Sequence, residues 1–139
     1  MVPTVDEFFN QEYNIRRAKI AAILLYHVAD YWFDENNNNY NNLSELHKYL
    51  IHECPDFLLI RYLADVSKHA TLNTQKNIPR KLSSSDQVSR SPGLFDAPFG
   101  VGSFSEAVTV FAIMDDGDKK KVSPAIKSVK EMWTKIFVQ

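Results

Sequence analysis

The spacing of apolar side chains predicts a long amphipathic helix at the start of the chain. Thr4 and Glu7 have the spacing of a capping box, so we expect this helix to begin there. At about 100° per residue, one broad face collects mostly apolar side chains, namely Tyr13, Ile20, Ala21, Leu24, Leu25, Val28, Tyr31 and Trp32. Ile23, Tyr26 and Phe33 lie toward the polar side. The helix is therefore expected to contact neighbours on more than one side and to be the central helix.

Two shorter helices are predicted to follow. The segment 34–42 contains six Asn residues, whose side chains compete with the backbone for hydrogen bonds and favour a solvated loop. Asn42 is well placed to cap a second helix over 43–54, which has one apolar stripe. A third helix is expected over 55–69, because Pro55 loses no hydrogen bond in a first helical turn.

The second half of the chain has a different amino-acid composition. Proline, glycine and serine recur through 70–105, which predicts a long loop of functional importance or without fixed structure. The β-branched run 107–114, the turn signal Asp116-Gly117 and the segment 119–122 together predict a β-hairpin. A last helix with one apolar face is expected to begin at Ser123.

These elements predict an α+β fold that is predominantly helical. We expect a single domain over 1–139, in which an antiparallel helical bundle formed by 4–69 is covered by a C-terminal β-hairpin and final helix (106–139). The first helix carries more apolar surface than one layer can hide, so a homodimer is expected as well.

Composition narrows the class of function only a little. The chain has 16 Lys and Arg against 17 Asp and Glu, so its overall field would recruit neither nucleic acid nor a membrane. The first 66 residues carry 5 basic and 10 acidic side chains and the rest carry 11 and 7, which is a mild charge dipole. Cys54 is the only cysteine, which excludes an intramolecular disulfide or thiolate cluster. A cytoplasmic protein without a membrane segment is expected.

The third predicted helix carries the strongest candidate for chemistry. Arg61, Asp65, Lys68 and His69 project within about 100° of one another, so four ionisable groups share one face. One interpretation is an exposed face with i,i+4 ion pairs. The other takes Arg61 as a phosphate clamp, His69 as a general acid or base and Asp65 as the group that orients the imidazole. The i,i+4,i+8 spacing predicts that Arg61, Asp65 and His69 form one connected stripe.

The stretch from Arg61 to His69, late in a helical bundle, resembles the HEPN superfamily of helical domains. The resemblance covers about residues 4–69 and rests on an Arg followed by a His. Here seven residues separate the two, a longer gap than usual, and Tyr62 follows the Arg. Many members are dimeric endoribonucleases and many others are not catalytic. The resemblance therefore implies the helical fold, and it places Arg61 and His69 in the catalytic role if the chain is an enzyme.

Two other groups of residues are candidate binding groups. Arg17 lies inside the apolar stripe of the first helix, so its guanidinium either reaches water or meets Asp65 or Asp30. Lys119, Lys120 and Lys121 are either a basic surface for RNA or a lysine-protected edge strand.

A metal site is not expected from the histidines. His27 and Asp30 lie one turn apart, and His47, His52 and Cys54 are close in sequence. No HExxH or ExxH spacing occurs, so any metal site would need ligands from several elements. No cofactor is expected either.

Two classes of function remain open on the sequence. The first is a non-catalytic HEPN-like interaction module whose loop 70–105 meets an RNA or protein partner, and the bare sequence favours it. The alternative is a metal-independent endoribonuclease of HEPN type with Arg61, Asp65 and His69 in its site.

Overall fold

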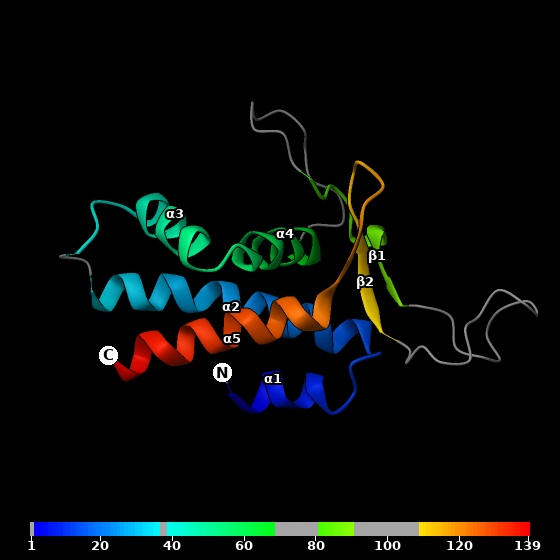
Figure 1. Ribbon diagram of the computed structural model, residues 1–139, viewed down its shortest axis with the longest axis horizontal. Coiled ribbons are helices and arrows are strands. Elements are labelled where there is room, and N and C mark those ends of the chain that lie inside the picture. Colours follow the sequence, from blue (N-terminus) through cyan, green and yellow to red (C-terminus); the bar gives the residue numbers. More distant parts are fainter. Residues whose placement is uncertain (1, 37–38, 69–80, 91–108) are drawn as a thin grey trace, which may run out of the picture.

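A computed structural model describes residues 2–36, 39–68, 81–90 and 109–139 (Figure 1). The described residues form five α-helices and a three-stranded antiparallel sheet, which confirms the predominantly helical α+β fold. In chain order the elements are α1 (Val2–Phe9), α2 (Ile15–Glu35), α3 (Leu43–Glu53), α4 (Asp56–Lys68), a 3-10 turn (Ser85–Gln87), β1 (Val88–Arg90), β2 (Val110–Ile113), β3 (Lys119–Lys121) and α5 (Val122–Val138).

The prediction of one long first helix was wrong, because two helices, α1 and α2, occupy that stretch. The first begins at Val2 rather than at a Thr4 cap, with Pro3 in its first turn, where proline is well tolerated. The break has a local cause. The side chain of Asn14 accepts a hydrogen bond from the backbone N–H of Arg17 at 3.1 Å and so starts α2 afresh.

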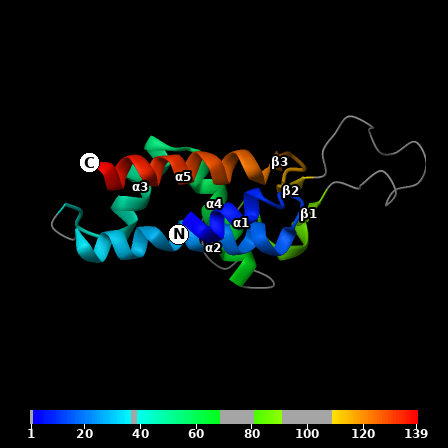
Figure 2. The ribbon, with the colours of Figure 1, turned by 90° about the horizontal axis from the view of Figure 1, so that it is seen from below.

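The next two helices lie where the sequence places them. Asn42 caps α3 by accepting from the backbone N–H of Glu45 at 2.9 Å, and α4 starts directly after Pro55. The long helix α2 runs beneath both of them, and α5 lies beside α2 and packs against both α2 and α4 (Figures 1 and 2). The central position expected for this helix is confirmed.

The buried face of α2 differs from the predicted one. Tyr13 precedes the helix and is exposed, Ile20 is exposed, and Tyr31 has 72% of its surface exposed. Ala21 and Leu25 are buried as predicted, and the other fully buried positions, Ala18, Ala22 and Ala29, are small residues outside the predicted face. Alanines allow the neighbouring helices to approach the α2 axis closely, so the larger apolar side chains are displaced to the flanks of the contact.

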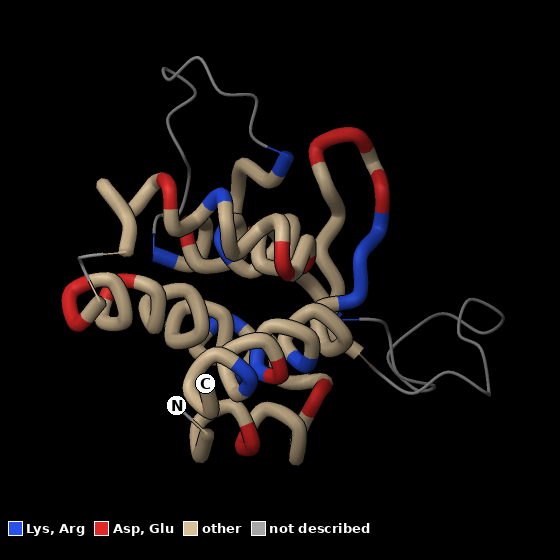
Figure 3. Tube along the Cα trace, turned by 60° about the vertical axis from the view of Figure 1, so that its left-hand side comes forward, with Lys and Arg blue, Asp and Glu red and all other residues tan. Residues whose placement is uncertain are grey.

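The sheet contains a strand that the sequence did not predict. The segment 81–90, inside the expected loop 70–105, includes β1, which pairs antiparallel with β2 in the register Val88 with Ala112. The predicted hairpin is confirmed: β2 pairs with β3, and Gly117 adopts a φ of 87° in the turn between them. Acidic residues of this turn lead directly into the basic strand β3 (Figure 3).

The last helix, α5, contacts both helices at the start of the chain. It begins one residue before the predicted Ser123 cap, at Val122, and its inner face carries six buried side chains. The indole of Trp133 is fully buried and donates to the carbonyl of Leu25 on α2 at 3.0 Å. Lys130 reaches Asp6 of α1 at 2.8 Å. Helix α5 thus holds both α1 and α2.

Within the described ranges, no helix is long and apolar enough to cross a membrane.

Candidate functional site

The ionisable face of α4 is directed toward α2 rather than entirely into solvent. Arg61 and Asp65 are half-buried, and both affect the pKa of Tyr26 on α2. No hydrogen bond or ion pair joins Arg61 to Asp65 in the described part of the chain. The two charges therefore act across the helix interface, without the direct pair that their spacing suggested. His69 lies outside the described residues, so its predicted contact with Asp65 stays a prediction.

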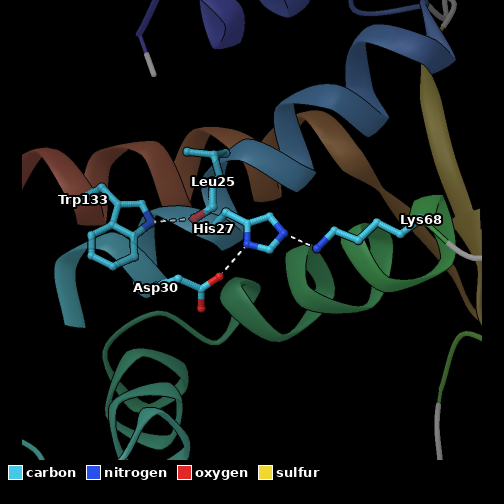
Figure 4. Close-up of polar contacts among 5 residues, drawn as sticks. All are labelled: Leu25, His27, Asp30, Lys68 and Trp133. Atoms are coloured by element: carbon cyan, nitrogen blue, oxygen red, sulfur yellow. Dashed lines mark hydrogen bonds and ion pairs between the residues drawn. The ribbon is translucent and has the colours of Figure 1, made fainter. Parts of the chain in front are cut away.

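A three-membered polar chain crosses from α2 to α4 beside these residues. The Nδ1 atom of His27 lies 2.5 Å from a carboxylate oxygen of Asp30, one turn further along α2. The other ring nitrogen of His27, Nε2, contacts the ammonium group of Lys68 near the end of α4 (Figure 4). The side chains of His27 and Asp30 are 34% and 39% exposed, so a ligand in solution can reach them.

These two contacts fix the tautomer of His27. An ammonium group can only donate and an ionised carboxylate can only accept. The Nδ1 atom therefore carries the proton and donates to Asp30, whereas Nε2 offers its lone pair to Lys68. An imidazole that donates to a carboxylate from one nitrogen and accepts at the other has the orientation that a general base requires.

The ring of Tyr26, on α2, contacts residues of both α3 and α4. Its ring centroid lies 5.4 Å from that of His27 and 5.3 Å from that of His47, and the Lys68 ammonium lies 5.8 Å above it. Burial raises the pKa of the Tyr26 phenol, and the negative charge of Asp65 adds to the rise, although Arg61 opposes it. Tyr26 therefore remains a neutral hydroxyl group at physiological pH.

His47, on α3, is the buried member of the same group of residues. It is only 6% exposed, and its Nε2 atom has no hydrogen-bond partner in the described structure. Its ring packs against Tyr26 and, at 5.9 Å between centroids, against Phe57. Burial lowers the pKa of His47 and Arg61 lowers it further, whereas Asp30 and Asp65 oppose this shift. Burial therefore favours the neutral form of this ring.

No protein-family model, curated protein or solved structure matches this chain.

Seven side chains from three helices thus gather at one place, and we call them the polar cluster: Tyr26, His27, Asp30, His47, Arg61, Asp65 and Lys68. The cluster combines two cations, two carboxylates and an oriented imidazole. Such a set can bind an anionic group and exchange a proton with it.

No group of three or more His, Cys, Asp and Glu side chains among the described residues is arranged to hold a metal ion.

Arg17 has a different partner from those suggested by the sequence. Its guanidinium donates to the backbone carbonyl of Glu7 at 3.0 Å, and neither Asp30 nor Asp65 is its partner. The residue therefore bridges the end of α1 to the start of α2. Its position explains how an arginine is accommodated beside an apolar stripe, because the stem follows the helix while the head satisfies a free carbonyl at a helix end.

The three lysines of β3 form the edge of the sheet. All are exposed, and the strand order β1-β2-β3 leaves one side of β3 without a neighbouring strand in the described structure. The Lys119 ammonium lies 4.1 Å from the ring centroid of Phe111 on β2, a cation–π contact. This arrangement matches the lysine-protected edge strand that the sequence offered as one interpretation. An RNA-binding role for Lys119, Lys120 and Lys121 stays a prediction.

The sequence predicted the site residues on α4 but not those on α2 and α3. His27 and Asp30 were recognised only as a pair one turn apart, in the context of a metal site. Their i,i+3 spacing, together with an adjacent tyrosine at the edge of the apolar face, is a signal that could have marked them. The burial of His47 is not encoded locally, because it depends on how α3 crosses α2.

Proposed function

We propose that this protein is a metal-independent endoribonuclease and that the polar cluster is its catalytic centre. The observation that carries the proposal is the chain Asp30–His27–Lys68, in which a carboxylate orients an imidazole whose second nitrogen accepts from a cation. RNA is the substrate class that this equipment suits, because its own 2′-hydroxyl supplies the nucleophile. The protein then has to provide only a base and a positive charge at the phosphate.

The proposed reaction is cleavage by the neighbouring 2′-hydroxyl. His27 Nε2 takes the proton of that hydroxyl, whose oxygen then forms a bond to the adjacent phosphorus. The bond from phosphorus to the 5′-oxygen breaks, and the leaving oxygen takes a proton from solvent. The products are a 2′,3′-cyclic phosphate and a 5′-hydroxyl, and His27 returns its proton to water.

Each neighbour of His27 has a defined role in this proposal. Lys68 is exposed and has three donors, so it can leave Nε2 and hold a phosphate oxygen while the substrate hydroxyl takes its place. Arg61 presents a planar fork that suits a second phosphate oxygen. Asp30 keeps the proton of His27 on Nδ1 and stabilises the imidazolium that forms, as the carboxylate does in other oriented histidines.

The test is incubation of the protein with mixed-sequence single-stranded RNA in the presence of a chelator. We expect cleavage with cyclic phosphate ends, and a DNA strand of the same sequence should stay intact because it lacks the nucleophile. His27→Gln is expected to lower the rate by about 10²- to 10⁴-fold, the usual contribution of a general base. Asp30→Asn should lower it as well.

His52→Gln is the matched control, because His52 lies on α3 with 85% of its side chain exposed and outside the polar cluster. It should cleave as the natural sequence does. Intact RNA, or equal rates for His27→Gln and His52→Gln, would overturn the proposal. His69→Ala in the same assay tests the role of His69 that the HEPN resemblance implies.

A non-catalytic interaction module is the second candidate. The observation that favours it is the exposure of large apolar side chains on α2, chiefly Ile20 and Tyr31, which is typical of surfaces that contact another protein. If RNA binds without being cleaved, or is not bound at all, this candidate is preferred.

A further inference from the structure

A pocket lies further along α2, away from the polar cluster and toward the end of the helix. It has a volume of about 300 Å³ and lies between the last turn of α2, the segment before α3, α3 itself and the end of α5. Among the described residues no charged side chain lines it; the lining residues are Trp32, Asn36, Tyr40, Leu46, Tyr49, Leu50, Trp133, Ile136 and Gln139. Pockets at the lower end of the size range for small ligands have this volume.

Four of the nine residues that line this pocket are aromatic. The ring centroids of Trp32 and Tyr40 are 5.8 Å apart in an edge-on arrangement, and those of Tyr40 and Tyr49 are also 5.8 Å apart. Trp133 adds a fourth ring, held in place by its hydrogen bond to Leu25. Trp133 is fully buried, so the rings of Trp32, Tyr40 and Tyr49, from three separate segments, are the ones with surface to offer one small group, as in the cages that recognise methylated ammonium ions.

The electrostatic surroundings favour a cation. Burial raises the pKa of the Tyr40 phenol, and Tyr49 and the carboxylates of Glu45 and Glu53 add to the rise. The last turn of α2, which supplies Trp32 and Asn36, contains no basic residue, so the negative end of its dipole is not offset there.

An adjoining depression strengthens the same preference. It shares Tyr49, Ile136 and Gln139 with the aromatic pocket, and it adds the carboxylates of Glu53, Asp56 and Glu131 against one cation, Lys135. Acidic groups therefore lie next to the aromatic pocket. An anionic ligand would be repelled by them, and a neutral apolar ligand would make no use of them.

We propose that the aromatic pocket binds a methylated ammonium group, either as a small quaternary ammonium compound or as a methylated lysine side chain. The cation lies against Trp32, Tyr40 and Tyr49, and the carboxylates of the adjoining depression provide longer-range attraction. The site is separate from the polar cluster and does not depend on the proposed ribonuclease activity.

The two tryptophans of the chain make binding directly observable. The sequence contains only Trp32 and Trp133, and both line the pocket, so ligand binding should change the intrinsic fluorescence. The probes are choline, Nε-trimethyllysine and 3,3-dimethylbutan-1-ol, a neutral compound with the shape of choline. We expect saturable changes with the two cations and a binding constant at least about fivefold weaker for the neutral compound.

The choice between the two sources follows from the same titrations. Tighter binding of choline indicates a small metabolite, and tighter binding of trimethyllysine within a basic peptide indicates a protein partner that uses the acidic depression. Both results support the methylated ammonium site. Equal binding of choline and its neutral analogue, or no saturable change with either cation, would overturn it.

Substitution of one ring supplies the control. Tyr49 is 41% exposed, so the Tyr49→Leu variant should fold. We expect it to bind choline about five- to tenfold more weakly than the natural sequence does. Tyr31→Leu removes an exposed tyrosine of α2 that does not line the pocket, and it should bind normally. Equal loss in both variants would show that the fluorescence change does not come from the pocket.

Discussion

Acidification should destabilise this protein through His47 in particular. Burial, with a further contribution from Arg61, lowers the pKa of His47 in the folded chain below the ordinary histidine value of 6.5. The unfolded chain therefore binds more protons than the folded one once the pH falls below about 6.5. The free energy of unfolding is highest above that pH, and it decreases as the pH falls toward the lower pKa of the folded state.

The size of the effect has a ceiling set by the burial of the ring. His47 is 6% exposed with no partner for Nε2 in the described structure, so the folded state offers little to stabilise its charge. If the folded ring stayed neutral throughout, proton uptake by the unfolded chain would lower the free energy of unfolding by about 1.4 kcal/mol at pH 5.5 and about 2 kcal/mol at pH 5.

The assay is urea unfolding followed by tryptophan fluorescence at pH 7.5, 6.5, 5.5 and 5. His47→Leu removes the titrating group, so the difference between its stability and that of the natural sequence should change by up to about 2 kcal/mol over this range. The change in that difference is diagnostic. The absolute stability at neutral pH also reflects the loss of the unpartnered nitrogen and of the ring contacts.

His52→Leu is the control on the same helix, because the side chain of His52 is 85% exposed. It should follow the natural sequence at every pH. If the profiles of His47→Leu and the natural sequence run parallel, or if His52→Leu changes the profile as much, the inference that His47 is held neutral by burial is wrong.

Two further predictions concern the helices. Asn42→Ala should lower the free energy of unfolding by about 0.5–2 kcal/mol, because the Glu45 N–H loses its cap; Asn41→Ala, at a neighbouring exposed position, should cost less in the same urea titration. The homodimer predicted from the sequence should give the mass of a dimer in light scattering at tens of micromolar protein. We expect the exposed side chains of Ile20 and Tyr31 to lie near the contact. The mass of a monomer at that concentration would refute this prediction.

The sequence predicted elements well where the signal was local. Asn42 and Pro55 mark helix starts through their own chemistry, and Gly117 marks a turn that needs a positive φ. The failures came where neighbours decided the outcome. Nothing within β1 identifies it as a strand, since three residues carry little periodicity and the strand exists because β2 offers an edge.

The candidate site was predicted in part for the same reason. Arg61, Asp65 and Lys68 share a face because helical geometry requires it, so the sequence could place them together. Their actual partners on α2 and α3 depend on how the helices cross. No single-helix pattern contains that information, and His47 in particular reads as an ordinary histidine on an amphipathic helix.

The small side chains along the buried face of α2 have a consequence for the precision of the polar cluster. Alanine has no rotamers, so the contact made by Ala18, Ala21, Ala22 and Ala29 has no alternative packing into which it could relax. The helix that carries His27 and Asp30 is therefore positioned by backbone against its neighbours, rather than by side chains that can exchange conformations. Preorganisation of this kind means that the imidazole and its carboxylate are aligned before any ligand arrives, and that enlarging even one of these alanines would shift both together.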